Sequence, residues 1–350
     1  MKMNYFHLFK TLYIILNDNF LNALQKTNAN RYVPIWLLRQ AGRYLPEYRK
    51  IRAKNEDFFA MIKKPEVCCE LTLQPLRRFK LDAAITFTDI LTIPDALGLE
   101  VEFVKNKGPV FKKSFLQNKR LRLDQTNFLD MLDYVFQATN LIKSNIDLPL
   151  IGFCGSPWTI FTYMFYGESP KNFEIIKNYI SENIESTEET LSLLTQLSIA
   201  YLKEQAKNGA DCLQIFDSWG GILGDNYVKY SLKYINEIRK EVPHNIPIIL
   251  YSRGQKVIDF LQDSDIKIFN FDSSEKLEKY IDLPLTVQGN LDPTVFNNSD
   301  QKLISLAENI YLKFSKKNNY ICNLGSGLTP DINPERVGTF LNHLRFLNSQ

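Results

Sequence analysis

The residues best suited to chemistry in this 350-residue chain are four arginines near its start. Arg39, Arg43, Arg49 and Arg52 fall within fourteen positions, and the short apolar run PIWLL leads directly into the first of them. Guanidinium groups are costly to remove from water unless they meet anions, and their planar forks match carboxylates and phosphates. A solvated basic loop is the alternative. An apolar segment that delivers arginines at its end favours a binding site for a polyanionic ligand.

Composition narrows the classes of function. The net charge is only +3, so nothing global indicates a nucleic-acid partner. Five cysteines and three histidines show no metal-ligand spacing, which argues against a metal site and against a Ser-His-Asp triad. The odd cysteine count indicates a reducing compartment, and we expect a cytoplasmic protein. No stretch reaches the roughly 18 apolar residues that span a bilayer, so we expect no membrane partner.

The elements that must position these residues alternate along the chain. Short β-type runs are followed by polar loops and then by helical stretches such as Glu185–Lys207, Tyr227–Val242 and Gln301–Lys316, and this alternation predicts a parallel sheet. The eight predicted strands are Pro34–Leu38, Ala83–Phe87, Leu148–Phe153, Cys212–Phe216, Ile246–Tyr251, Ile266–Phe271, Leu285–Gln288 and Tyr320–Leu324.

Eight such strands predict an α/β fold, a (β/α)8 TIM-type barrel. A doubly wound open sheet is the alternative, because the gap between the fifth and sixth strands is short. No linker divides the chain, so we expect a single barrel domain over residues 16–350 after an N-terminal extension over residues 1–15.

Candidate functional residues gather where the predicted strands end. Arg39 follows the first strand and Asp89 the second, and the runs GSPWT, FDSWGG, QGNLDP and NLGSG follow the third, fourth, seventh and eighth. In barrel enzymes the carboxyl ends of the strands carry the active site. Each motif alone is weak, since glycine and tryptophan at a strand end can simply pack a turn. Their joint placement predicts an active site for a small-molecule substrate at this face.

The motifs RQAGRYLPEYR, FTDIL, GFCGSPWT, FDSWGG and QGNLDP, in this order, resemble the uroporphyrinogen decarboxylase family. The resemblance extends from about Leu16 to the C-terminus. It implies a (β/α)8 barrel, usually a homodimer, that uses no metal or organic cofactor. It also implies the reaction, in which the four acetate side chains of uroporphyrinogen III become methyl groups to give coproporphyrinogen III on the haem route.

The chemistry of that reaction fits Asp89. Loss of CO2 from an acetate leaves a carbanion, so an electron sink is required, and a pyrrole protonated on carbon supplies one as a cation. A fixed negative group beside the pyrrole nitrogens would stabilise that cation, and Asp89 emerges from an apolar strand where a carboxylate can act this way. The alternative role for Asp89 is a helix N-cap before the next helical turn.

By resemblance, catalysis falls to Asp89, Arg39 and Tyr163. The substrate-binding residues that the resemblance implies are Arg39, Gln40, Arg43, Asp89, Tyr163, Phe216, Ser218 and Ser326. We discount Arg39 as a proton donor, because a guanidinium group does not release its proton in proteins. The alternative role for Tyr163 is that of a helix residue packed against the barrel, with its hydroxyl group exposed to water.

One departure from the family pattern concerns Ser326. The family normally has histidine in the motif after the eighth strand, and serine cannot carry its positive charge. We therefore expect reduced rather than absent activity, with a catalytically weakened porphyrinogen-binding homologue as the alternative.

Other classes fit the sequence less well. Cobalamin-linked methyltransferases share such a barrel but need His-x-Cys…Cys zinc ligands, which this chain lacks. A sugar-phosphate enzyme would leave the arginine cluster unexplained, and a purely binding protein would not need the chemistry of Asp89.

Overall fold

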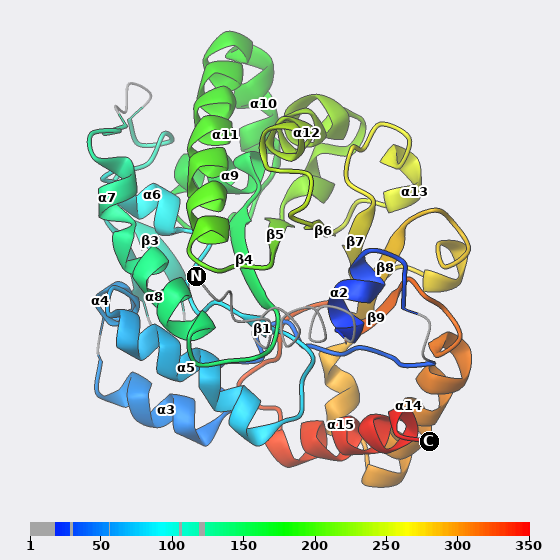
Figure 1. Ribbon diagram of the computed structural model, residues 1–350. Helices are drawn as coiled ribbons and strands as arrows, with labels where there is room; N and C mark the ends of the chain where they lie inside the picture. Colours follow the sequence, from blue (N-terminus) through cyan, green and yellow to red (C-terminus); the bar gives the residue numbers. More distant parts are fainter. Residues whose placement is uncertain (1–17, 29–30, 56, 105–106, 119–122) are drawn as a thin grey trace, which may run out of the picture.

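The computed structural model describes residues 18–28, 31–55, 57–104, 107–118 and 123–350. The predicted extension over residues 1–15 lies outside the described residues. Seven parallel strands form one curved sheet in the order β1-β4-β5-β6-β7-β8-β9, with helices around its outside (Figure 1). The strands are β1 (Ala84–Ile85), β4 (Leu150–Gly155), β5 (Cys212–Asp217), β6 (Ile248–Ser252), β7 (Ile268–Phe271), β8 (Thr286–Leu291) and β9 (Tyr320–Leu324). The architecture is that of a TIM-type α/β barrel, as predicted.

Helices surround this sheet (Figure 1). They are α2 (Asn19–Leu24), α3 (Pro46–Ala53), α4 (Phe58–Ile62), α5 (Pro65–Arg78), α6 (Thr92–Ala96), α7 (Phe128–Met131), α8 (Asp133–Lys143), α9 (Pro157–Tyr166), α10 (Glu174–Glu182), α11 (Ile184–Lys207), α12 (Lys233–Glu241), α13 (Val257–Phe260), α14 (Asp300–Phe314) and α15 (Pro334–Asn348). Buried side chains recur every three or four residues along α11, among them Leu191, Leu194 and Leu202, as expected of a helix with one face on a sheet. None of the described helices is long and apolar enough to cross a membrane.

The first predicted strand, Pro34–Leu38, is not a strand but a single β-bridge. Ile35 pairs in parallel with Cys322 of β9, and the Ile35 carbonyl accepts a hydrogen bond from Asp82 N–H, just before β1 (2.8 Å). The segment therefore lies between β9 and β1 and fills the place of the eighth strand. Its neighbours are reached through isolated contacts rather than a continuous ladder.

Side chains inside the barrel hold this closing segment. Trp36 Nε1 donates to Gln288 Oε1 (3.0 Å), and Gln288 Nε2 donates to Asn270 Oδ1 (2.6 Å). Asn323 Nδ2 donates to the same Asn270 oxygen (3.0 Å), and its own Oδ1 accepts from Leu38 N–H (2.9 Å). Buried amides are stable only when paired in this way. The closing segment is thus joined to β7, β8 and β9 by polar side chains.

A hairpin that was not predicted from the sequence lies outside the barrel. β2 (Val101–Val104) and β3 (Gly108–Phe111) pair antiparallel, with Val101 opposite Phe111. Val101 is buried while Glu102 is exposed, the alternation of a half-covered ribbon. Phe103 packs against Phe58 of α4, with ring centroids 4.6 Å apart, so the hairpin rests on the α4 side of the molecule.

Candidate active site

A cavity of about 410 Å³ opens at the carboxyl ends of the strands, and we call it the carboxyl-end cavity. Six of the eight predicted site residues line it: Arg39, Gln40, Asp89, Phe216, Ser218 and Ser326. They lie at or just after the ends of the closing segment, β1, β5 and β9, which are far apart along the chain. The barrel topology therefore brings together the side chains that the sequence had grouped only by their positions after strands.

Arg39 adopts a left-handed backbone conformation, with φ of +58°. This region is uncommon for a residue with a Cβ atom, and where it persists it points to a functional constraint. The side chain passes over Gly327, where an added Cβ would lie 2.7 Å from Arg39 Cγ and 2.8 Å from Nε, so a methyl group there would require Arg39 to shift. Gly327 thus leaves the room that lets Arg39 line the cavity.

Asp89 faces the same cavity in a poorly solvated place. Burial raises the pKa of Asp89 to about 6, although a backbone hydrogen bond and the charge of Arg39 both lower it. The hydrogen bond comes from Leu91 N–H to Asp89 Oδ1 (2.9 Å). Asp89 therefore caps a turn, as the alternative interpretation expected, and also presents a carboxylate to the cavity. The two roles coexist.

Gln40 lines the cavity but is occupied with holding the chain. Its Nε2 donates to the Ala83 carbonyl (3.3 Å), and its Oε1 accepts from Leu37 N–H (3.3 Å). Phe216 forms an apolar wall with two other lining rings, Phe153 at 5.4 Å and Tyr251 at 5.7 Å between centroids. The cavity therefore has a charged end and an aromatic wall.

The GSPWT and FDSWGG motifs act mainly as supports for this wall. Asp217 is fully buried and accepts hydrogen bonds from Ser156 Oγ (2.6 Å), Ser231 Oγ (2.9 Å) and Thr159 Oγ1 (3.3 Å). Burial raises the pKa of Asp217, and the neighbouring hydroxyl groups, these three among them, counter that effect. These contacts tie the loop after β4 to the end of β5, and Ser218 follows at once.

Two predicted residues are not among those that line the cavity. Arg43 is exposed and is not one of the described residues that line the cavity. Tyr163 lies on α9 with its ring 5.9 Å from that of Trp219, and burial raises the pKa of its hydroxyl group. Both remain predictions as substrate-binding residues, placed outside the cavity itself.

Arg253, which was not among the predicted site residues, lines the cavity directly after β6. The signal was present, because Arg253 follows an apolar strand just as Arg39 follows the closing segment. Among the described residues, no three His, Cys, Asp or Glu side chains are grouped so as to hold a metal ion. The prediction that no metal or cofactor is needed stays a prediction, because grouping alone does not test it.

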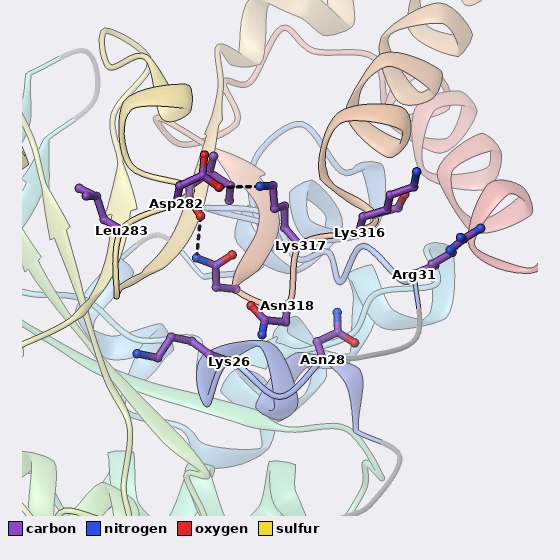
Figure 2. A pocket seen from close by; sticks show the side chains of 11 residues that line it. Lys26, Asn28, Arg31, Asp282, Leu283, Lys316, Lys317 and Asn318 are labelled. Carbon is purple, nitrogen blue, oxygen red and sulfur yellow. Dashed lines mark hydrogen bonds and ion pairs between the residues drawn. The ribbon is translucent and has the colours of Figure 1, made fainter.

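A larger cavity, of about 610 Å³, lies at the other end of the barrel, and we call it the amino-end cavity. It is bounded by the end of α2, the loop before β8 and the turn between α14 and β9. Four cations line it: Lys26, Arg31, Lys316 and Lys317. Figure 2 shows Lys317 paired with Asp282 (2.6 Å), while the head groups of Lys26 and Arg31 extend in opposite directions. Its charges diverge, so it does not form a convergent site.

The fold and the carboxyl-end cavity together define a TIM-type barrel enzyme with arginines at its active face. The same fold occurs in a methyltransferase from Methanosarcina mazei, with a TM-score of 0.75 and 16% identity, covering 94% of this chain and 97% of that one. At this identity the likeness concerns the fold alone.

Sequence relatives are more specific. The chain matches the model of the family "Uroporphyrinogen decarboxylase (URO-D)" over residues 16–346, and it belongs to that family. It is 41% identical over 323 residues to a uroporphyrinogen decarboxylase of Francisella tularensis subsp. novicida, covering 89% of this chain and 94% of the relative. It is also 41% identical over 332 residues to one of Vesicomyosocius okutanii, covering 92% and 96%. The resemblance inferred from the motifs is confirmed.

Proposed function

We propose that the chain is a uroporphyrinogen decarboxylase, a carboxy-lyase that converts the four acetate groups of uroporphyrinogen III to methyl groups. The observation that carries the proposal is one cavity that holds a guanidinium group and a poorly solvated carboxylate, Arg39 and Asp89, in a chain of this family. The product is coproporphyrinogen III, on the route to haem.

Substrate binding follows from the charges and the wall of the cavity. Uroporphyrinogen carries eight carboxylate groups, and charge-assisted hydrogen bonds from arginine are strong and geometrically specific. Arg39 would bind one of these groups, and Phe216 would contact the apolar face of the macrocycle. Ser218 and Ser326 supply neutral hydroxyl donors at two further points of the cavity.

Each decarboxylation then proceeds through a cation on the reacting pyrrole. A proton adds to a ring carbon, the bond between the acetate methylene and its carboxyl carbon breaks, and CO2 leaves. The electron pair enters the ring, the methylene carbon takes up a proton to become methyl, and the ring carbon releases its proton. The ionised Asp89 side chain would stabilise the cation, because a fixed charge in a poorly solvated cavity acts more strongly than one in water.

Two further properties belong to this proposal. We expect a homodimer, as the family resemblance implies, and a cytoplasmic protein, as the cysteine usage indicates. Light scattering on the purified protein at several concentrations would test the first, since a mass that stays at that of a single chain contradicts it.

Anaerobic incubation with uroporphyrinogen III, with and without a chelator, tests the function. Chromatography of the oxidised products should show eight carboxylates falling to four, equally in both samples. Loss of activity with chelator that returns with zinc would contradict the cofactor-free reaction. Tight binding without CO2 release would instead identify the weakened porphyrinogen-binding homologue.

A further inference from the structure

Arg253 follows the strand that lies opposite the closing segment, which carries Arg39, in the order of the sheet. The closing segment, residues 34–38, is bridged to β9 on one side and hydrogen-bonded next to β1 on the other. Counted from this segment, β6 is the fourth neighbour through β1, β4 and β5, and also the fourth through β9, β8 and β7. Arg253 follows β6 and Arg39 follows the closing segment, so the two arginines start from opposite walls of one cavity.

The backbone that carries Arg253 is fixed from three sides. Its N–H donates to the Asp217 carbonyl (3.4 Å), and its own carbonyl accepts from Gly221 N–H (3.1 Å). The next residue, Gly254, has φ of +73° and donates its N–H to Asp272 Oδ2 at the end of β7 (2.7 Å). Gly221 packs so closely that an added Cβ would lie 2.7 Å from Gly254 Cα. The loop is held firmly at this position.

The side chain, in contrast, is uncommitted. Arg253 is exposed, and among the described residues no carboxylate lies within ion-pair distance of its guanidinium group. The nearby Tyr251 hydroxyl feels both arginines: burial raises the pKa of Tyr251, while the charges of Arg253 and Arg39 lower it. Tyr251 Oη also donates to the Gly325 carbonyl beside Ser326 (3.0 Å), so this wall is braced against the loop after β9.

We propose that Arg253 is a second carboxylate-binding residue of the active site, which binds a carboxylate on the side of the substrate opposite to the one held by Arg39. The inference rests on the proposed function. A macrocycle with carboxylates around its whole rim can engage both walls at once, whereas a small acid would reach only one. Two fixed anchors on opposite walls would set the orientation of the ring above Asp89.

Arg253→Gln tests the inference, with Lys316→Gln in the amino-end cavity as the matched loss of one positive charge. We expect Arg253→Gln to raise KM for uroporphyrinogen by roughly 10-fold to 100-fold and to flatten the dependence of KM on salt, with a smaller change in kcat. Arg253→Lys should have a KM between those of wild type and Arg253→Gln, since lysine keeps the charge but lacks the planar guanidinium group. Lys316→Gln should behave as wild type.

Binding of uroporphyrin, followed by its fluorescence, separates this inference from the function itself. If wild type binds uroporphyrin but releases no CO2, the function fails, and weaker binding by Arg253→Gln would still support the second anchor. If wild type is active and Arg253→Gln matches it in KM, in uroporphyrin affinity and in salt dependence, the inference is wrong. Equal losses of uroporphyrin affinity in Arg253→Gln and Lys316→Gln would also overturn it, because they would show an effect of the protein's overall charge and not of a local contact.

Discussion

The cavities at the two ends of the barrel differ in how their charged side chains are arranged, more than in their volumes. The amino-end cavity is the larger, at about 610 Å³ against 410 Å³, and holds more cations. Its Lys317 is neutralised by Asp282, and its Lys26 Nζ donates to the Pro284 carbonyl (3.2 Å). The carboxyl-end cavity holds two arginines on facing walls around one carboxylate, Asp89.

The difference shows that convergence, rather than charge, distinguishes a site from a basic surface. Parallel strands direct their following loops toward one face, so residues far apart in sequence meet there. At the amino ends the loops only return the chain to the sheet, and Lys26 and Lys317 bind local partners there instead of converging on one point. If the comparison holds, substitutions at one end should change catalysis and those at the other should not.

The largest effect is expected from Asp89→Asn. Removal of one charge-stabilising group from a dry site typically lowers kcat about 100-fold to 1,000-fold, and a carboxylate that faces a cation should matter at least as much. Asparagine keeps an oxygen for Leu91 N–H, so the turn should survive, as circular dichroism can verify. A variant with most of its turnover intact would leave Asp89 only the capping role.

The next largest effect is expected from Arg39→Ala. Arg43→Ala is its comparison, because the two arginines are close in sequence but only Arg39 lines the cavity. Loss of a charged hydrogen bond costs about 1.5–3 kcal/mol, so we expect KM to rise by roughly 10-fold to 100-fold for Arg39→Ala. Arg43 is exposed and does not line the cavity, so its effect should be smaller. Titration of uroporphyrin binding at low and high salt measures both. Equal effects would place Arg43 in the site after all.

Gly327→Ala should act through Arg39 without removing any functional group. The new methyl group would collide with the Arg39 side chain and force it to move. Because that side chain is flexible, the fold should remain stable, while KM rises by less than in Arg39→Ala. Combining the two substitutions provides the control, since the effects of residues in contact are not additive. Full additivity in KM would show that Gly327 does not position Arg39.

As pH rises from about 4 to 6, we expect the stability of the fold to fall while its activity rises, because both depend on the ionisation of Asp89. With a pKa raised from 3.8 to about 6, Asp89 in the folded chain favours the protonated form. Its contribution to stability is therefore present below pH 4 and is lost as pH rises toward 6, at most about 3 kcal/mol. The active carboxylate forms over the same range, so kcat/KM should rise. Thermal melts of wild type and Asp89→Asn should converge at low pH and separate, with the variant more stable, at neutral pH.

The smallest effect is expected from Ser326→His. If the family histidine assists catalysis here, the substitution should raise turnover a few-fold and change the pH–rate profile near neutrality, where imidazole titrates. Ser326 lines the cavity at the polar loop after β9, so the added volume should be tolerated. Superimposable profiles for wild type and variant would mean that this departure from the family carries no catalytic cost.

Much of this architecture was predictable from the sequence because strand periodicity and strand-end residues are local signals. Seven predicted strands match β1 and β4 to β9 within a few residues, as do the helices predicted at α11 and α14. The first strand was wrong because its apolar run resembles a buried strand, while Trp36 and Leu38 are held by side-chain amides far along the chain. No local pattern records such partners.

The site was predictable to a similar depth. Asp89 and Ser218 were found because they follow strands within recognisable motifs. Arg253 was missed although it follows an apolar strand, because the run SRGQ at the end of β6 resembles an ordinary turn and its place opposite Arg39 exists only once the sheet closes. The pKa of Asp89 and the crowding at Gly327 likewise depend on neighbours that spacing cannot indicate.

The closing segment has a consequence for the order in which the barrel loosens. Ladders of backbone hydrogen bonds resist local opening better than an isolated bridge, so we expect the barrel to open first between residues 34–38 and the neighbouring strands. A ligand bound by arginines on both walls would link the closing segment to the opposite side of the barrel and so stabilise it. Occupancy of the cavity would then slow amide hydrogen exchange at residues 34–38 more than in β5, which is paired along its length on both sides.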